Sequence, residues 1–277
     1  MALLYKTMAK KSLGQNFLTN KNKIGEIISA LELKNRDIII EIGPGHGELT
    51  REILKNPFSR LMAIEKDAHL ANLLKNDKFL MSNVKIPKIE IITGDVLKIL
   101  PPLVENLSFG IGNLKLVGNI PYYITGFLLR TLSELKYKPK IIVLTVQKEV
   151  AERICAQPPT MNLLAASVQL WAQPEIMGLI PKEDFSPEPK VDSAIIKLIT
   201  KDLEFKTKNT ENFYKFIKIL FKQPRKTISN NVSELFKNKK EADVFLEKNG
   251  IAPASRPQDL NVESIKEMAE IIYNKQR

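Results

Sequence analysis

Cysteine and histidine are scarce in this chain. Its 277 residues include one cysteine, Cys155, and two histidines, His46 and His69. One cysteine cannot form an intramolecular disulfide, and three such residues cannot build a cysteine/histidine metal cluster. We therefore expect no disulfide, no metal and a reducing, cytoplasmic compartment.

Long apolar runs are also missing. The longest, such as residues 141–146, have the length of a β-strand and fall far below the roughly 18 to 20 residues needed to cross a bilayer. The first residues are basic but lack the apolar segment of a signal peptide. We expect a soluble monomer with no membrane partner and no cleaved leader.

Positive charge is in excess. The chain has 42 lysines and arginines against 31 aspartates and glutamates, a formal net charge of +11. Basic side chains bind polyanions by releasing the counterions condensed on phosphates, so nucleic acid is the favoured partner. A solvated, lysine-rich surface would have the same composition, and charge alone does not separate the two interpretations.

Short apolar runs rich in branched side chains alternate with stretches long enough for helices. This alternation is typical of a doubly wound α/β domain. The runs that we interpret as buried parallel strands are 38–42, 61–65, 89–93, 114–118 and 141–146. Further strands are expected within 171–180 and 194–199, and we expect the sheet to end near residue 205.

After Lys201 the pattern changes to helices separated by polar turns. Apolar residues then recur at helical spacing, namely Phe213, Phe216, Ile217, Leu220 and Phe221. The sequence therefore predicts an α/β domain over 1–205 and a smaller, all-helical C-terminal domain over 206–277.

A glycine-rich turn follows the first predicted strand. Gly43, Gly45 and Gly47 would let the backbone approach a ligand closely and direct amides of the next helix toward it. The spacing G-x-G-x-G differs from the dinucleotide pattern G-x-G-x-x-G. The turn favours a nucleoside-bearing cofactor, with a plain strand-to-helix turn as the alternative.

A carboxylate residue stands at or just after the end of each of the next two predicted strands. Glu65 ends the second strand, where it could accept hydrogen bonds from ribose hydroxyls. Asp95 follows the third strand and could accept from an adenine amine. An N-cap for the helix that begins at Val96 explains Asp95 equally well.

The fourth strand runs into a turn, residues 118–123, that suits methylation of an amine. The side-chain carbonyl of Asn119 and a backbone carbonyl beside Pro121 can both accept from an NH2 group, and proline removes a competing donor. Tyr122 can stack on a base that is unpaired or extruded from a helix. The alternative is a proline turn with a buried aromatic side chain.

Six segments, spread over nearly the whole length, together carry a family resemblance. They are residues 11–18, 41–45, 119–122, 144–151, 185–193 and 225–231. In this order they resemble the ribosomal RNA adenine dimethylase family. The resemblance implies a Rossmann-like class I sheet that binds S-adenosylmethionine, followed by a smaller helical domain.

The resemblance also assigns roles to residues. The cofactor would be bound by Asn16, Leu18, Gly43, Gly45, Glu65, Asp95 and Asn119, with Glu65 on the ribose and Asp95 near the adenine amine. The target base would be held by Asn119, Pro121, Tyr122 and Phe185. Tyr123 and Thr125 depart from the family pattern, as does His46, which we interpret as a tolerated neighbour of the pocket.

Family members methylate N6 of two adjacent adenosines near the 3′ end of 16S rRNA, each twice, within an immature small ribosomal subunit. The product is N6,N6-dimethyladenosine. We expect this partner to be bound by basic residues of both ends of the chain, namely Lys10, Lys11, Lys218, Lys222, Arg225 and Lys226. An ordinary solvated helix surface is the alternative for the C-terminal group.

Other functions compete with this interpretation. A 23S rRNA adenine methylase of the antibiotic-resistance type shares the upstream loops, but residues 225–231 and the long helical tail argue against it. A non-catalytic RNA-binding assembly factor is opposed by the intact turn at 119–122. DNA or protein-glutamine methyltransferases do not explain residues 15–18 together with the basic tail, and a nicotinamide dehydrogenase is opposed by the glycine spacing.

Overall fold

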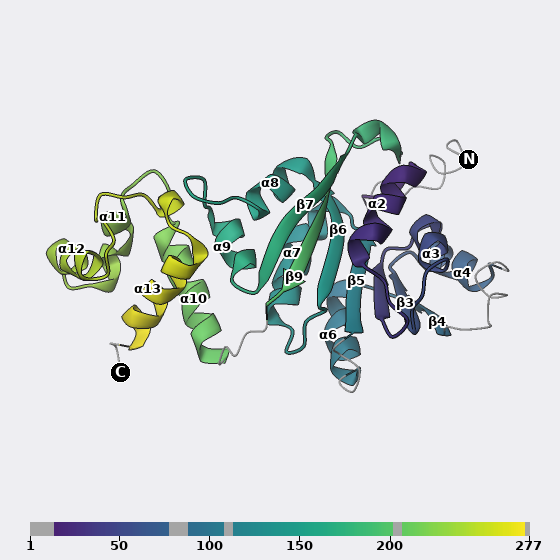
Figure 1. Cartoon of the computed structure of the whole chain (residues 1–277), viewed down its shortest axis with the longest axis horizontal. Coiled ribbons are helices and arrows are strands. Elements are labelled where there is room, and N and C mark those ends of the chain that lie inside the picture. Colours follow the sequence, from purple (N-terminus) through teal and green to yellow (C-terminus); the bar gives the residue numbers. More distant parts are fainter. Residues whose placement is uncertain (1–13, 78–87, 108–112, 202–206, 275–277) are drawn as a thin grey trace. The chain divides into compact units, whose positions relative to one another are not determined.

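The computed structural model describes residues 14–77, 88–107, 113–201 and 207–274 (Figure 1). The chain forms two compact units. The sheet unit comprises Met1–Ala151 and Pro174–Thr200, and the helical unit comprises Glu152–Gln173 and Lys201–Arg277. The division differs from the expected one, with its boundary near residue 205, in two respects: the helical unit begins at Lys201, and it includes the segment Glu152–Gln173. That segment groups with the helical unit because its helix α9 (Leu163–Gln169) packs against helices α10 and α13 of the same unit.

A seven-stranded sheet forms the centre of the sheet unit, in the order β4-β3-β2-β5-β6-β9-β7. The strands are β2 (Ile38–Ile42), β3 (Arg60–Glu65), β4 (Lys88–Thr93), β5 (Leu114–Asn119), β6 (Ile141–Gln147), β7 (Ala172–Ile180) and β9 (Ser193–Thr200). The first five are parallel, and β9 pairs antiparallel with β6. The predicted α/β fold and its five parallel strands are confirmed.

The order of the strands reverses between β2 and β5. The chain moves outward from β2 to β3 and β4, then returns to place β5 on the other side of β2. Ligands of open parallel sheets bind at such a switch point, outside the carboxyl ends of the strands. Here Gly43 follows β2 and Asn119 ends β5, so the predicted cofactor loop and the predicted catalytic turn meet at this point.

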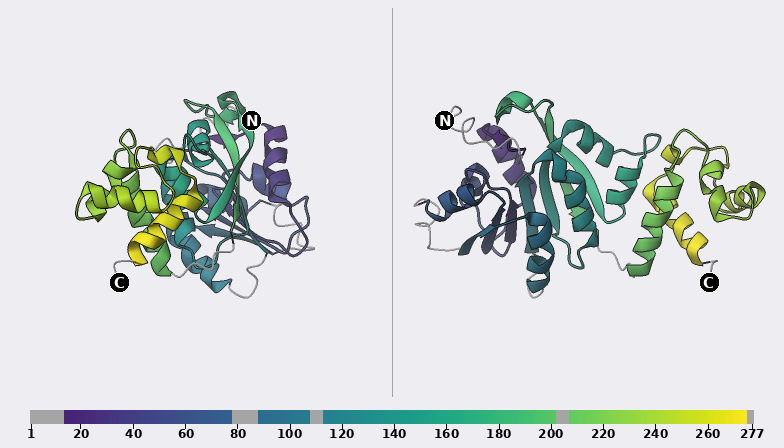
Figure 2. Two further views of the ribbon diagram at one scale, coloured as in Figure 1. Left: turned by 60° about the vertical axis from the view of Figure 1, so that its left-hand side comes forward. Right: turned by 180° about the vertical axis from the view of Figure 1, so that it is seen from behind.

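Helices cover both faces of this sheet. Helices α2 and α3 pack together on one face, over a core of apolar side chains that includes Ile27, Ile53 and Val143. Helices α6 and α7 contact each other and lie on the opposite face, which the view from behind in Figure 2 shows. The helices of this unit are α2 (Lys21–Leu31), α3 (Glu48–Ile53), α4 (Ala68–Lys75), α6 (Val96–Asn106), α7 (Thr125–Glu134) and α8 (Lys148–Ile154), which runs into the helical unit; the 3-10 turns are η3 (Tyr122–Ile124) and η4 (Lys182–Asp184).

A second, two-stranded sheet joins β1 (Phe17–Leu18) to β8 (Phe185–Ser186) in antiparallel pairing. Leu18 pairs with Phe185, and both side chains are buried. The segment that precedes α2 is thereby fixed beside the sheet, and residues 14–17 are placed at its ligand edge.

The helical unit confirms the apolar stripe that the sequence predicts. Phe213, Phe216, Ile217 and Leu220 are each at most 1% exposed. The elements of this unit are α9, α10 (Thr207–Leu220), α11 (Ile228–Val232), α12 (Lys239–Lys248), α13 (Val262–Asn274), η5 (Ser233–Leu235) and η6 (Pro257–Asp259). No helix in the described part of the chain is long and apolar enough to span a membrane.

Candidate active site

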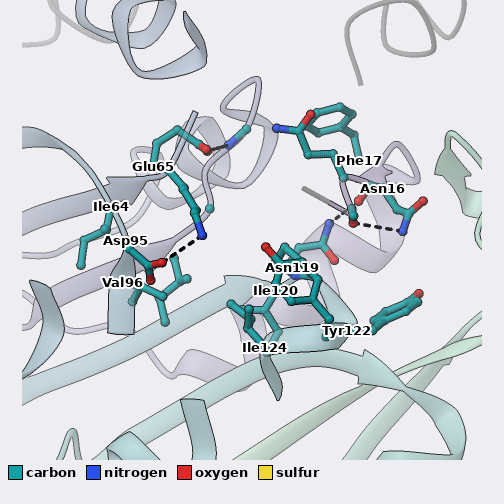
Figure 3. A pocket seen from close by; sticks show the side chains of 18 of the residues that line it. Asn16, Phe17, Ile64, Glu65, Asp95, Val96, Asn119, Ile120, Tyr122 and Ile124 are labelled. Carbon is teal, nitrogen blue, oxygen red and sulfur yellow. Dashed lines mark hydrogen bonds and ion pairs between the residues drawn. The ribbon is translucent and has the colours of Figure 1, made fainter. Parts of the chain in front are cut away.

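A pocket opens at the switch point between β2 and β5 (Figure 3). The space between its walls, with the part open to solvent included, is about 800 Å³. Its walls come from the loops after β2, β3, β4 and β5 and from residues 14–17. All the predicted cofactor residues except Leu18 line it, namely Asn16, Gly43, Gly45, Glu65, Asp95 and Asn119.

The glycines of the first loop keep the pocket open. Gly43 and Gly45 have φ values of +63° and +60°, a region that side-chain-bearing residues rarely adopt. A Cβ atom on Gly45 would lie 2.9 Å from the ring of Phe17. One on Gly43 would lie 3.8 Å from the backbone oxygen of Asn119. The backbone of the glycine loop therefore lies close to Phe17 and Asn119, and the absence of side chains at Gly43 and Gly45 permits this close approach.

Glu65 is fixed at the end of β3 by two backbone donors. Its Oε2 accepts from the Gly45 N–H at 3.0 Å, and its Oε1 accepts from the Asp67 N–H at 2.8 Å. Only 5% of the residue is exposed, and burial raises the pKa of its carboxyl group, against the effect of these donors. A carboxylate has roughly four lone-pair sites, so acceptor capacity remains for a ligand hydroxyl.

Asp95 caps a helix, as one interpretation of the sequence predicts, and it also lies in the wall of the pocket. Its Oδ1 accepts from the Leu97 N–H at 3.0 Å and caps helix α6, while the residue also lines the pocket. Its Oδ2 accepts from the Lys66 ammonium at 2.9 Å, the ion pair drawn in Figure 3. Lys66 lowers the pKa of this carboxyl group, so Asp95 remains ionised and able to accept from a ligand amine.

The turn after β5 presents two carbonyl groups. The Asn119 side-chain nitrogen donates to the backbone oxygen of Asn16 at 2.8 Å, which leaves the side-chain oxygen for a ligand. The backbone oxygen of Pro121 already accepts from the Ile124 N–H at 3.1 Å in the 3-10 turn. The Pro121 carbonyl is thus already engaged, whereas Ile120, the residue before the proline, also lines the pocket.

Tyr122 is held by a contact to a distant strand. Its hydroxyl lies 2.6 Å from the Ser193 hydroxyl, at the start of β9. Burial raises the pKa of the phenol. The ring lines the pocket, and this contact fixes the position of its hydroxyl end.

Two predicted site residues lie elsewhere. Phe185 is 4% exposed and Leu18 is 6% exposed, and both belong to the apolar core beside β6 and β9. Neither lines the large pocket, because their mutual strand pairing turns them inward; Leu18 lines only a smaller neighbouring hollow. Contact between Phe185 and the base is not supported by this arrangement.

The predicted RNA contacts fall into two groups. Lys10 and Lys11 lie outside the described residues. Lys218, Lys222, Arg225 and Lys226 are all exposed on the helical unit. Helix α10 ends at Leu220, so only Lys218 belongs to it, and Lys222 forms an ion pair with Glu234 at 2.7 Å.

Sequence reasoning missed several wall residues, among them Gln15, Phe17, Lys66 and Tyr123. Gln15 and Phe17 fall inside a segment that carries the family resemblance, and that resemblance was the signal that could have found them. His46 packs edge-on against Phe17 with ring centroids 4.5 Å apart, and burial lowers the pKa of its imidazole. The described residues contain no group of three or more His, Cys, Asp or Glu that could hold a metal ion.

Comparison with known proteins identifies the family. The family model described as "Ribosomal RNA adenine dimethylase" matches residues 6–274. The chain belongs to this family. It is 36% identical to "Ribosomal RNA small subunit methyltransferase A" of Natranaerobius thermophilus, over 98% of this chain and 94% of that protein. It is 37% identical to the protein of the same name from Clostridioides difficile, over 98% and 93%.

Solved structures agree with this assignment. A dimethyladenosine transferase from Plasmodium falciparum superposes with a TM-score of 0.79 at 26% identity, over 94% of this chain and 98% of that one. The 23S rRNA methyltransferase ErmE superposes with a TM-score of 0.72 at 22% identity, over 93% and 100%. The second likeness shows the fold alone. The chain is thus an enzyme with a class I methyltransferase fold, as the sequence predicts.

Proposed function

We propose that this enzyme transfers methyl groups from S-adenosylmethionine to N6 of two adjacent adenosines near the 3′ end of 16S rRNA. The observation that carries the proposal is the composition of one pocket. Acceptors suited to a nucleoside, on Glu65 and Asp95, share it with the turn that presents Asn119 and Tyr122. The names of the relatives support the small subunit as the source of the RNA.

The residues present fit the cofactor. The glycine loop lies so close to Phe17 that a Cβ atom at Gly45 would approach its ring to 2.9 Å, and Glu65 offers buried carboxylate oxygens beside this loop. Glu65 would accept from the ribose hydroxyls and Asp95 from the adenine amine. Bound S-adenosylmethionine supplies a methyl group already activated by its sulfonium, so the protein need not generate a strong base.

The side chains of the turn then position the target amine. Asn119 Oδ1 and the Ile120 carbonyl would accept its two N–H groups and direct the nitrogen lone pair at the methyl carbon. With the cofactor held by Glu65 and Asp95, its methyl group would pass to the amine nitrogen, S-adenosylhomocysteine would be the leaving group, and the amine would then lose a proton to water. The same carbonyl oxygens stabilise the positive charge that develops on nitrogen. Alignment of this kind is worth up to about 7 to 11 kcal/mol in favourable systems.

The rest of the substrate would be bound by the basic surface. The +11 charge of the chain and the exposed cations of the helical unit suit a phosphate-rich partner. The partner in this proposal is an immature small ribosomal subunit in the cytoplasm. The enzyme would act on it as a monomer, and each adenosine would receive two methyl groups to give N6,N6-dimethyladenosine.

The test compares two substrates with an isotopically labelled methyl donor. Immature small subunits and naked 23S rRNA are incubated separately with the full chain, and the RNA is digested to nucleosides for mass spectrometry. We expect labelled N6,N6-dimethyladenosine from the small subunit alone. Label confined to 23S rRNA would instead indicate an enzyme of the antibiotic-resistance type. Tight binding without label in either RNA would indicate a non-catalytic assembly factor.

A further inference from the structure

An exposed aromatic stripe leads away from the pocket along helix α7. Phe127 is 64% exposed and Tyr123 is 51% exposed, the two highest values among the large apolar side chains in the described part of the chain. Arg130 follows, with 78% of its side chain exposed. We call Tyr123, Phe127 and Arg130 the α7 stripe.

The spacing places these residues on one face. They stand four and then three positions apart, through η3 and the first turns of α7, and residues at such intervals are neighbours on a helical surface. The opposite face of α7 is the one that packs, since Thr125, Leu128, Leu129 and Leu132 are buried. The stripe therefore lies on the solvent-exposed face of the helix, and the opposite face packs against the core.

The stripe begins at the active site. Tyr123 follows directly on Tyr122 and lines the pocket itself. A Cβ atom on Gly14 would lie 3.3 Å from two atoms of the Tyr123 ring, so this ring closes one edge of the wall.

Isolated exposed apolar residues are common on soluble proteins and require no explanation. Here two aromatic rings and a guanidinium lie in sequence on one helical face that starts at a pocket suited to a nucleobase. Aromatic faces followed by a cation are the combination with which proteins bind unpaired nucleotides, by stacking on bases and contacting the backbone. Arg130 is paired with Glu134 at 2.9 Å, but both side chains are exposed, and such a pair is readily exchanged for a phosphate.

We propose that the α7 stripe binds the unpaired nucleotides adjacent to the target adenosine. Tyr123 and Phe127 stack on neighbouring bases, and Arg130 contacts the phosphate between or beyond them. This inference rests on the proposed function, because it takes the occupant of the pocket to be a base of an RNA strand. It adds a binding surface outside the pocket.

The test uses the full chain with substitutions at Phe127. Phe127→Ala should raise the KM for immature small subunits by about 5- to 150-fold, the range found for loss of one stacked base. Phe127→Trp, which keeps an aromatic face, should have a KM close to the wild-type value. Phe127→Leu, which keeps an apolar side chain without a π face, should have a raised KM like that of Phe127→Ala. The affinity for S-adenosylmethionine, measured by calorimetry, should be unchanged in all three variants.

Leu73→Ala is the matched control. Leu73 is 45% exposed on α4 and does not line the pocket, so its replacement should leave the KM at the wild-type value. A wild-type KM for Phe127→Ala would overturn the inference. A wild-type KM for Phe127→Leu would also overturn the inference, because it would indicate a plain apolar contact, for example with a protein of the subunit.

A second measurement separates this inference from the proposed function. An unstructured, adenosine-containing oligoribonucleotide is titrated with wild type, Phe127→Ala and Arg130→Gln, and binding is followed by fluorescence anisotropy. Weaker binding by Phe127→Ala, and a salt slope reduced by roughly 0.7 in Arg130→Gln, support the stripe even if no methylation occurs. Equal binding by all three proteins would contradict the stripe even if the wild type methylates 16S rRNA.

Discussion

The hydroxyl groups of Tyr122 and Ser193 lie 2.6 Å apart and join the turn after β5 to the first residue of β9. In the sheet, β6 lies between these two strands. Ser193 is completely buried, so its position is set by the antiparallel pairing of β9 with β6. The contact therefore fixes the hydroxyl end of the Tyr122 ring, which lines the pocket, to a residue that the sheet holds in place.

Removing either hydroxyl should slow methyl transfer without changing cofactor affinity. A neutral hydrogen bond contributes about 0.5 to 1.5 kcal/mol, so Tyr122→Phe and Ser193→Ala should each lower the single-turnover rate by about 2- to 12-fold. Because both variants remove the same bond, the double variant should be no slower than the slower single variant. If the rate reduction in the double variant equalled the product of the two single reductions, the two hydroxyls would act independently.

Cofactor affinity should fall at acid pH through Glu65. Ligand hydroxyls donate to the ionised carboxylate, and burial raises the pKa of this group above its ordinary value of 4.5. Affinity should therefore be full above the raised pKa and decline as the pH falls through it. Glu65→Gln should weaken binding at neutral pH by about 1.5 to 3 kcal/mol and abolish this pH dependence. Calorimetry from pH 5 to pH 8 measures both, and an unchanged affinity in Glu65→Gln would exclude the assigned role.

A buried carboxyl group at Glu41 should make the fold less stable as the pH rises. Glu41 is fully buried, accepts from the Thr50 hydroxyl at 2.8 Å, and has a pKa raised by burial to about 8. Between the ordinary value of 4.5 and about 8, the folded state keeps a proton that the unfolded chain has released. The free energy of unfolding should fall with pH in this window, by at most about 1.4 kcal/mol per pH unit.

Glu41→Gln provides the comparison, because the amide resembles the protonated carboxyl group in shape and does not titrate. Urea denaturation at pH 5, 6, 7 and 8 should show the variant gaining stability relative to wild type as the pH increases. Parallel stability curves over this range would contradict a proton held at Glu41.

The exposed cations of the helical unit should contribute to RNA binding through their charge. Replacing Lys218, Lys222, Arg225 and Lys226 together by Gln should reduce the slope of log affinity against log salt by roughly 0.7 to 0.9 for each phosphate that these cations neutralise. Affinity for S-adenosylmethionine should not change. An unchanged salt slope with immature small subunits would assign RNA binding to another surface.

Much of the sheet and the site could be predicted because local pattern determines them. Buried parallel strands are continuous apolar runs, and the ends of β2, β3 and β5 carry Gly43, Glu65 and Asn119 directly at or after them. The parallel arrangement then brings these residues to one edge. Family resemblance supplied Asn16, whose placement depends on the pairing of β1 with the distant β8.

What the sequence did not reveal depends on interactions between distant segments. The pairing of Leu18 with Phe185 turns both side chains into the core, although each stands beside residues suited to the pocket. Lys66 pairs with Asp95 across two loops, and no spacing rule predicts that ion pair. The grouping of α9 with α10 and α13 arises from packing between helices far apart in the chain.

In the proposed mechanism, the turn at Asn119 positions an adenine amine for methyl transfer from a cofactor held by Glu65 and Asp95. The most direct test is mass spectrometry of nucleosides from immature small subunits incubated with a deuterated methyl donor and either wild type or Asn119→Ala. We predict labelled N6,N6-dimethyladenosine at two adjacent positions near the 3′ end of 16S rRNA with wild type and almost none with the variant. Label at another nucleotide or another atom of adenine, or equal yields from the two proteins, would contradict this account.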